Sequence, residues 1–317
     1  MNNIKWCFIG ASRIARKVAS ELKESGNFNI KTVYNRTKEK GLKFAQDFNA
    51  EYFPNVEDAI KDCDFVYIAL NNNLHYKYAK IALENKKNVF MEKPFTINSY
   101  EAEELINIAK ANNCFIVEAM WTWFNDAAIK VKELLPRLGK IKSANMAFSF
   151  PINSISKTGR VWENSSGGGS LLDLGVYPIY YSYKLFGLPK DIKAKSKIVK
   201  DIDSYTEIVF SYDGFNSYIK SGIDRILSED AIIRGENGYI RVPFFHKAKK
   251  VIIKVNNKKE VFKFNDLLYK KEFELVEKEY LEGKKESSYV TIEDTINIMK
   301  LLDKIRDIIS LKFKDLE

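Results

Sequence analysis

Apolar and polar residues follow two alternating patterns between Ile4 and Ala119. Short apolar runs, of the kind that form buried strands, are each followed by a segment with the apolar spacing of an amphipathic helix. In residues 11–25, for example, Ile14, Val18 and Leu22 fall on one face of the predicted helix. Strands that alternate with helices in this way predict an α/β domain with a doubly wound parallel sheet.

The pattern changes in the second half of the chain. Between Asp191 and Phe264 the helical spacing disappears, and short alternating runs predict antiparallel strands. The predicted turns are Asp213-Gly214, Glu236-Asn237-Gly238 and Asn256-Asn257. We therefore expect an N-terminal domain of residues 1–122 and a second, α+β domain of residues 123–290 with a large, mostly antiparallel sheet. Residues 291–317 are expected to form a C-terminal helix that packs back on the N-terminal domain.

Composition and charge exclude several classes of partner. The formal net charge is +9, but the lysines are spread over most of the 317 residues, without the basic, aromatic-interleaved patch of a nucleic-acid-binding protein. No window reaches the roughly 18 consecutive apolar residues of a membrane span. Three cysteines beside apolar runs predict buried thiols, and two histidines without a ligand cluster predict no metal site. We expect a cytoplasmic protein that binds small molecules, with neither nucleic acid nor membrane as a partner.

The turn after the first predicted strand reads IGASRIA and partly matches a dinucleotide-binding fingerprint. That fingerprint requires small residues at three positions, so that the backbone and a helix N-terminus can approach a pyrophosphate. Gly10 and Ala15 fit the first and third positions, and Ser12 takes the second. The predicted cofactor contacts in this turn are Gly10, Ala11, Ser12, Arg13 and Ile14. An ordinary strand-to-helix turn is the alternative interpretation.

The end of the second predicted strand indicates which cofactor binds. A site specific for NAD(H) places a carboxylate there, whereas this chain has Tyr-Asn-Arg-Thr-Lys over residues 34–38. Arg36 can pair with a 2′-phosphate, and Asn35 or Thr37 can donate a hydrogen bond to it. We therefore predict NADP(H) as the preferred cofactor and keep NAD(H) as the alternative. The alternative interpretation, without a cofactor, is that these residues are solvated charges at the start of a surface helix.

Charge also follows the fifth predicted strand, where Val-Phe-Met is stopped by Glu92, Lys93 and Pro94. Ligands of open α/β sheets bind at the carboxyl ends of the strands, so Lys93 would face the cofactor crevice. A lysine held at this edge is a candidate acid, base or substrate clamp. The predicted cofactor contacts at the ends of the fourth and fifth strands are Leu70, Asn71, Asn72, His75, Glu92 and Lys93.

A glycine-rich segment, SSGGGSLLDLGVYPIYY, occupies residues 165–181. Ser170 is expected to cap a helix, on which Asp173 and Tyr177 would share one face because they are four residues apart. Gly175 lies between them, where a side chain could collide with a neighbour or a ligand. The alternative is that Tyr177 is a core aromatic, since three further tyrosines follow it in the same segment.

Together, IGASRIA, EKP and GGGSLLDLGVY resemble the Gfo/Idh/MocA family of NAD(P)-dependent oxidoreductases, which pair a Rossmann domain with an α/β domain. The similarity runs nearly end to end and includes EAMWTWF at residues 118–124. Many members have histidine at the position of Tyr177. A tyrosine there is similar to the branch of the family that contains dihydrodiol and D-xylose dehydrogenases. Trp123 and Asn71 depart from residues common in that branch, and these departures put the substrate in doubt.

The resemblance implies hydride transfer between NADP(H) and a sugar, polyol or trans-dihydrodiol. It implies Tyr177 as proton donor or acceptor, assisted by Lys93, with Asp173 as a third catalytic residue. The substrate-binding residues that it implies are Trp121, Phe150, Arg160 and Trp162. A homodimer or higher homo-oligomer through the second-domain sheet is also expected. The rival interpretation is a non-catalytic NADP(H)-binding regulator or sensor on the same fold.

Overall fold

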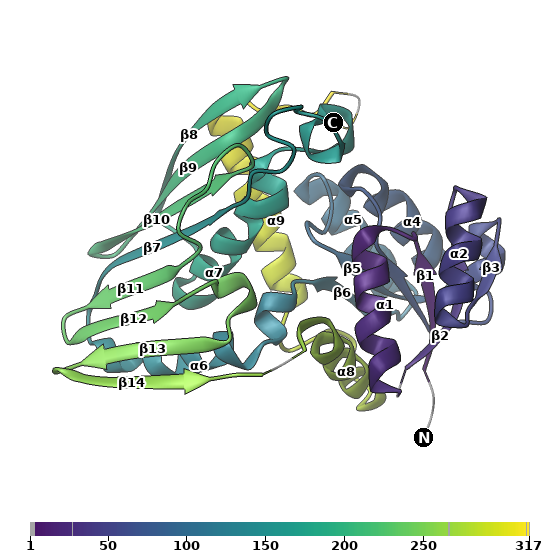
Figure 1. Cartoon of the computed structure of the whole chain (residues 1–317), viewed down its shortest axis with the longest axis horizontal. Helices are drawn as coiled ribbons and strands as arrows, with labels where there is room; N and C mark the ends of the chain where they lie inside the picture. The colour runs from purple at the N-terminus through teal and green to yellow at the C-terminus, as the bar shows by residue number, and fades with distance from the viewer. Residues whose placement is uncertain (1–3, 27, 266, 315, 317) are drawn as a thin grey trace. The chain divides into compact units, whose positions relative to one another are not determined.

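The structure is a computed structural model with two compact units (Figure 1). It describes residues 4–26, 28–265, 267–314 and 316. Unit 1 comprises Met1–Trp121 and Leu267–Ile296, and unit 2 comprises Thr122–Asp266 and Asn297–Glu317. The chain therefore returns to unit 1 after completing most of unit 2.

Unit 1 contains a six-stranded sheet in which every neighbouring pair is parallel. The strands are β1 (Lys5–Ile9), β2 (Asn29–Tyr34), β3 (Glu51–Phe53), β4 (Phe65–Ile68), β5 (Asn88–Glu92) and β6 (Ile116–Ala119). Their order, β3-β2-β1-β4-β5-β6, is that of doubly wound dinucleotide-binding sheets and reverses between β1 and β4. The predicted parallel sheet is thus confirmed.

Helices cover both faces of this sheet. They are α1 (Arg13–Ser25), α2 (Lys38–Phe48), α3 (Val56–Ile60), α4 (Asn72–Glu84), α5 (Ser99–Ala111) and α8 (Leu268–Leu281). In Figure 1, α1 and α8 lie together on one face, and α4 and α5 lie together on the other. Asn55 caps α3, because its Oδ1 accepts a hydrogen bond of 2.8 Å from the backbone N–H of Glu57.

Helix α8 was missed by the sequence analysis, which assigned its residues to the second domain. Its Phe273 is fully buried, with ring centroids 4.6 Å from Trp6 on β1, 5.1 Å from Tyr67 on β4 and 4.9 Å from Phe90 on β5. The assignment of residues 267–290 to the second domain is therefore corrected. These contacts belong to the core of unit 1, because they bury one aromatic ring against three of its strands.

Unit 2 contains an eight-stranded sheet in the order β14-β13-β12-β11-β7-β10-β9-β8. The strands are β7 (Ile141–Ser149), β8 (Asp191–Val199), β9 (Ile202–Tyr212), β10 (Phe215–Gly222), β11 (Ala231–Gly235), β12 (Gly238–Val242), β13 (Lys250–Val255) and β14 (Lys258–Lys263). Only the β10–β7 pair is parallel, so the predicted mostly antiparallel sheet is confirmed. All three predicted turns join consecutive strands; at one of them Asn256 and Asn257 both have positive φ, which asparagine tolerates.

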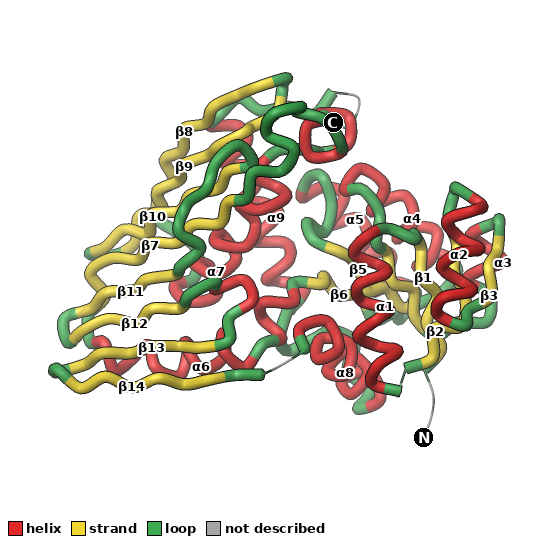
Figure 2. The backbone as a smooth tube through the Cα atoms, viewed as in Figure 1, coloured by secondary structure: helices red, strands yellow, loops and turns green. Residues whose placement is uncertain are grey.

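The helices of unit 2 are α6 (Asp126–Leu134), α7 (Val176–Phe186) and the later part of α9 (Ile292–Ile308). Helix α6 packs against β13, and α7 packs against β7 and β10, as the helix and strand colours of Figure 2 help to follow. Asn297 on α9 donates a hydrogen bond of 2.9 Å to the Tyr183 hydroxyl on α7. The predicted C-terminal helix exists, with Ile292–Ile296 in unit 1 and its later residues in unit 2, and the expected packing of residues 291–317 on the first domain stays a prediction.

The structure also describes the cysteines, the apolar character of the helices and the grouping of possible metal ligands. Cys7, Cys63 and Cys114 are buried free thiols, as predicted. Within the described ranges, no helix combines the length and the apolar character required to span a membrane. Nor do the described residues contain a group of three or more His, Cys, Asp or Glu side chains placed to hold a metal ion.

Candidate functional site

The register of the parallel sheet brings four strand ends of unit 1 to one level. Ile9 pairs with Tyr34 on one side and with Ile68 on the other, and Ile68 pairs with Met91. The residues that follow these four positions are Gly10, Asn35, Ala69 and Glu92. The segments predicted to hold the cofactor therefore meet at the carboxyl edge of the sheet, where ligands of such folds bind.

Gly10 closes the gap between β1 and β4. It has a φ of +106°, and a Cβ at this position would lie 2.7 Å from the Ala69 carbonyl oxygen and 2.8 Å from Leu70 Cδ2. Its N–H donates a hydrogen bond of 2.8 Å to the Tyr34 carbonyl. Only glycine fits here, so the chain turns into α1 directly at the point where the strand order reverses.

The N-terminus of α1 is capped by Ser12, whose Oγ accepts a hydrogen bond of 3.2 Å from the Ala15 N–H. The Ala11 N–H donates to Asn35 Oδ1 at 3.0 Å, and Asn35 Nδ2 donates to the Thr37 carbonyl at 2.8 Å. Asn35 therefore joins the first turn to the end of β2. A capped helix N-terminus of this kind attracts anions such as a pyrophosphate.

Arg36 follows β2 and is exposed to solvent. Beside it, the hydroxyls of Tyr34 and Tyr78 lie 3.2 Å apart. Burial and this hydrogen bond raise the pKa of Tyr78 to about 12, and the positive charge of Arg36 opposes that rise. The Arg36 guanidinium thus lies close enough to act electrostatically on the Tyr78 phenol.

His75 connects the ends of β4 and β5. Its ring is fully buried, with Nδ1 2.9 Å from the Pro94 carbonyl oxygen and Nε2 3.3 Å from the Leu70 carbonyl oxygen. Of the other predicted contacts in this stretch, Asn72 is also buried, whereas Asn71 is half-buried and precedes the first turn of α4. The structure therefore gives His75 a role in joining two strand ends, and its direct contact with a cofactor stays a prediction.

Glu92 and Lys93 differ in their surroundings. Glu92 is buried, and its Oε1 accepts a hydrogen bond of 2.6 Å from the Tyr67 hydroxyl. Lys93 is half-buried, and the peptide bond that joins it to Pro94 is cis. The glutamate of the EKP motif is thus bound within the sheet, whereas the lysine lies at its edge.

Glu118 on β6 is a buried acid to which the sequence analysis gave no role. One carboxylate oxygen accepts a hydrogen bond of 3.1 Å from the Phe95 N–H, and the other accepts one of 3.4 Å from the Thr295 hydroxyl. Burial raises the pKa of Glu118 to about 8, although these hydrogen bonds and the positive charge of Lys93 favour the ionised form. Glu118 therefore holds the chain just beyond Lys93.

In unit 2, Asp173 and Tyr177 lie where a π-helical turn, Leu171–Gly175, leads into α7. Both residues are buried. Asp173 Oδ1 accepts a hydrogen bond of 2.8 Å from Arg160 Nη2, which also makes the two an ion pair. Two residues with different predicted roles are thus in direct contact. Single π-helical turns within α-helices are frequent at functional sites.

Aromatic rings surround Tyr177. Its ring centroid lies 5.3 Å from that of Phe148 and 6.2 Å from that of His246, and Phe148 stacks on His246 at 3.9 Å. His246 Nε2 in turn lies 3.6 Å from Glu229 Oε2. The sequence analysis assigned no role to Phe148 or His246. Nothing in the residue pattern connects His246 to Tyr177, since they are 69 positions apart and only the fold brings them together.

Phe150 and Trp162 were predicted to line the substrate pocket, and in unit 2 one is exposed and the other is buried in a hydrophobic cluster. Phe150 is 58% exposed, and Phe148, two residues earlier on β7, is the phenylalanine that contacts Tyr177. Trp162 is buried in a hydrophobic cluster, and its Nε1 donates a hydrogen bond of 2.6 Å to the Ile152 carbonyl. Core packing therefore accounts for Trp162. In unit 1, Trp121 stacks on Tyr269 with ring centroids 5.3 Å apart.

Ser170 does not cap a helix with its side chain, contrary to the sequence prediction. Its hydroxyl instead donates a hydrogen bond of 2.7 Å to Asp203 Oδ2 on β9. The same oxygen accepts a hydrogen bond of 2.7 Å from the Leu171 N–H. Asp203 thus takes the capping role, and it comes from a strand more than 30 residues further along the chain.

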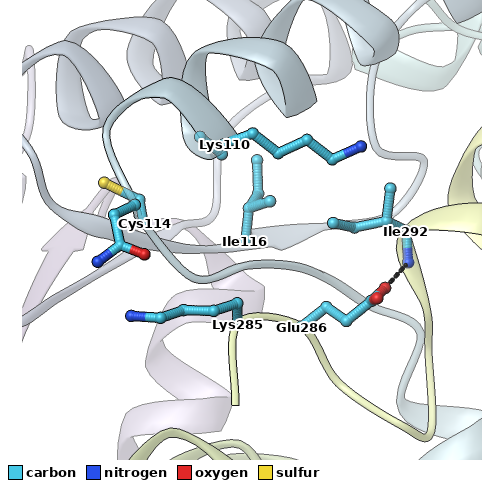
Figure 3. A pocket seen from close by; sticks show the side chains of 8 residues that line it. Lys110, Cys114, Ile116, Lys285, Glu286 and Ile292 are labelled. Carbon is cyan, nitrogen blue, oxygen red and sulfur yellow. Dashed lines mark hydrogen bonds between the residues drawn. The ribbon is translucent and has the colours of Figure 1, made fainter. Parts of the chain in front are cut away.

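A pocket of about 220 Å³ lies elsewhere in unit 1 (Figure 3). It is lined by Ala109, Lys110, Asn113, Cys114, Ile116, Lys285, Glu286 and Ile292. Figure 3 shows the hydrogen bond of 2.8 Å from the Ile292 N–H to Glu286 Oε2 at its side. Because Ile116 begins β6, the pocket lies at the amino end of that strand, away from the carboxyl ends where cofactors of this fold bind.

Comparison with known proteins covers both units. A family profile described as an oxidoreductase family with an NAD-binding Rossmann fold, GFO/IDH/MocA, matches residues 4–119. The profile of the GFO/IDH/MocA C-terminal domain matches residues 129–241. The first match contains all six strands of unit 1, and the second contains Tyr177 and the strands that surround it.

Individual proteins are similar over most of the chain. The scyllo-inositol 2-dehydrogenase (NADP(+)) IolU of Bacillus subtilis is 32% identical over 79% of this chain and 79% of its own length. A trans-1,2-dihydrobenzene-1,2-diol dehydrogenase of Xenopus laevis is 28% identical over 95% and 96%. Among solved structures, the 3-ketoreductase KijD10 of Actinomadura kijaniata, in complex with NADP and TDP-benzene, superposes with a TM-score of 0.87. It is 22% identical and covers 96% of this chain and 98% of that one, so it supports the fold alone.

Proposed function

Because the chain belongs to the Gfo/Idh/MocA family of oxidoreductases, we propose that it transfers a hydride between NADP(H) and the CH–OH or C=O carbon of a sugar, polyol or trans-dihydrodiol. The two profile matches confirm the family resemblance that the three sequence motifs predicted. The observation that carries the proposal is the presence of an ionisable lysine at the end of β5 and of a buried tyrosine on α7, in a chain with an NAD-binding domain.

The residues at the strand ends of unit 1 fit a dinucleotide. Gly10 keeps the first turn free of a side chain, since a Cβ there would collide with Ala69 and Leu70. The capped N-terminus of α1 can bind a pyrophosphate. We assign Arg36 and Asn35 to the 2′-phosphate, because β2 is followed by these residues and not by a carboxylate. The relatives named for NADP(+) support this preference. The nicotinamide, when bound, supplies the hydride donor or acceptor.

Tyr177 moves the proton in this proposal. During oxidation the substrate O–H loses its proton to the Tyr177 phenolate as hydride leaves the carbon, and reduction reverses both transfers. A free tyrosine has a pKa of roughly 10, so a neighbouring cation must stabilise the phenolate near neutrality. Lys93 is assigned this role. Arg160 donates a hydrogen bond to Asp173 in the π-helical turn that precedes α7, and its remaining N–H donors are assigned to substrate hydroxyls.

The proposed substrate has adjacent hydroxyl groups, because the names of the inositol and dihydrodiol dehydrogenases among the relatives share that chemistry.

We also expect a homo-oligomer. Ile198 on β8, Tyr218 on β10 and Val261 on β14 are 45%, 41% and 47% exposed, and we assign them to that contact through the unit 2 sheet. Sedimentation of the protein as a monomer at micromolar concentration would contradict this expectation.

The experiment that tests the proposed function compares two tyrosines of α7. Tyr177→Phe removes the proton donor and should lower turnover by on the order of 10² or more, with NADPH affinity unchanged. Tyr181→Phe is the matched control, because Tyr181 is fully buried and its hydroxyl has no hydrogen-bond partner among the described residues. Turnover is followed as NADPH formation from NADP⁺ with a panel of inositols, aldoses and dihydrodiols.

Two results of that experiment would count against the proposal. Equal turnover of Tyr177→Phe and the wild type would remove Tyr177 from the mechanism. A wild-type protein that binds NADPH but oxidises or reduces none of the panel would instead favour the non-catalytic regulator.

A further inference from the structure

Asp203 is the first acidic residue of β9 and is fully buried in unit 2. Its Oδ2 atom accepts three hydrogen bonds. The donors are Ser170 Oγ at 2.7 Å, the Leu171 N–H at 2.7 Å and Thr206 Oγ1 at 2.8 Å. Two of these donors belong to the start of the π-helical turn that carries Asp173, and the third belongs to β9 itself.

The other carboxylate oxygen of Asp203 lies against Gly169. A Cβ at position 169 would overlap Asp203 Oδ1, and this oxygen has no hydrogen-bond partner among the residues that the structure describes. A carboxylate buried in this way is costly unless the bonds it does make are strong. Close approach to Asp203 therefore accounts for the last glycine of the GGG run.

The far end of the π-helical turn is held by β10. Ser221 Oγ lies 3.1 Å from Ser170 Oγ, and a Cβ at position 175 would lie 2.9 Å from Ser221 Oγ. The turn Leu171–Gly175 is thus fixed at its first residue by Asp203 and at its last by close packing on Ser221. Asp173 and Tyr177 follow Leu171 by two and six positions, so their directions depend on how this turn is anchored.

We propose that Asp203 is a positioning residue for proton transfer, because it anchors the turn that sets the direction of Asp173 and Tyr177. The inference rests on the proposed function and adds a residue that lies outside the family's glycine-rich motif. Burial raises the pKa of Asp203 to about 6, and its three hydrogen bonds oppose that rise. The three donors on Oδ2 favour the ionised carboxylate, and a negative charge at a helix start is favourable.

A matched pair of hydroxyl deletions separates positioning from stability. Ser170→Ala removes the donor on the helix side, and Thr206→Val removes the donor on the strand side of the same oxygen. Each removes one hydrogen bond to Asp203 Oδ2 and one contact of 3.1 Å to a serine hydroxyl, Ser221 for Ser170 and Ser196 for Thr206, so the two variants should lose similar amounts of stability. The proposal expects a fall in kcat of about 10-fold for Ser170→Ala and a change below about 2-fold for Thr206→Val.

Substitution of Asp203 itself provides the second measurement. Asp203→Ala should lower kcat by about 10- to 100-fold, with the Kd for NADPH unchanged, and Asp203→Asn should recover most of the loss because it keeps one acceptor oxygen. If Asp203→Ala does not fold, the hydroxyl pair still decides. Equal kcat for Ser170→Ala and Thr206→Val would overturn the inference.

The inference can fail separately from the proposed function. If Tyr177→Phe loses turnover while Ser170→Ala and Asp203→Ala keep the wild-type kcat, then only the role of Asp203 is wrong. If Tyr177→Phe keeps full turnover, then the proposed function is wrong and the positioning role falls with it.

Discussion

At the scale of single residues, unit 1 contains buried acids in the EKP motif and close to it. Glu118 contacts the backbone beyond Lys93, and Glu92 accepts a hydrogen bond from Tyr67. Glu272 on α8 is fully buried, and burial with the nearby negative charge of Glu92 raises its pKa well above the ordinary value. An acid whose pKa is raised by burial makes the stability of unit 1 depend on pH, because the folded protein and the unfolded chain then bind different numbers of protons.

Glu118→Gln should remove one part of that pH dependence. The folded protein keeps the Glu118 proton up to about pH 8, whereas the unfolded chain releases it near the ordinary pKa of 4.5. The contribution of Glu118 to stability is therefore fully present below about pH 4.5 and is lost as the pH rises towards 8. Between about pH 5 and 8, the free energy of unfolding of Glu118→Gln should rise relative to the wild type by about 2 kcal/mol or more.

Urea denaturation at several pH values measures this difference. Glu84→Gln on α4 is the control, because Glu84 is exposed at the last residue of that helix. If the stabilities of Glu118→Gln and of the wild type change in parallel with pH, the assignment of a neutral, buried Glu118 is wrong.

Arg36→Ala tests the cofactor assignment. Loss of a charge-assisted contact to the 2′-phosphate should weaken NADPH binding by about 10- to 100-fold, with little effect on NADH, which lacks that group. Titration of intrinsic tryptophan fluorescence gives both affinities. Lys40→Ala, an exposed cation in the first turn of α2, is the control. Tighter binding of NADH than of NADPH by the wild type would contradict the assignment.

At the scale of secondary-structure elements, the order of strands and helices in unit 1 could be predicted because each has a clear apolar period. The capping of α3 by Asn55 and the three hairpin turns followed from local residue preferences. Helix α8 was missed because its partners are distant in sequence. Phe273 packs on Trp6, Tyr67 and Phe90, and no local pattern indicates that the chain returns to the first sheet.

The glycine-rich element shows where residue patterns are insufficient. The sequence indicated a helix that carries Asp173 and Tyr177, and the structure contains it. Its anchoring could not be predicted, because Asp203 reaches Ser170 and Leu171 only through the register of the sheet in unit 2. The pairing of Arg160 with Asp173 and the contact of Phe148 with Tyr177 are likewise tertiary contacts.

At the scale of the whole molecule, the proposed reaction draws on both units. Lys93 belongs to unit 1 with the strand ends assigned to the cofactor, and Tyr177 belongs to unit 2 with Arg160, which is assigned to the substrate. The central claim is that these two side chains act on the same proton transfer. Residues that act as a unit in catalysis have strongly non-additive effects when they are replaced together.

A double-mutant cycle on kcat/KM tests this claim most directly. Lys93→Met and Tyr177→Phe should each lower kcat/KM by on the order of 10² or more, and the double variant should lose little beyond the larger single loss. Losses that multiply in the double variant would show that Lys93 and Tyr177 act independently, and would contradict the account.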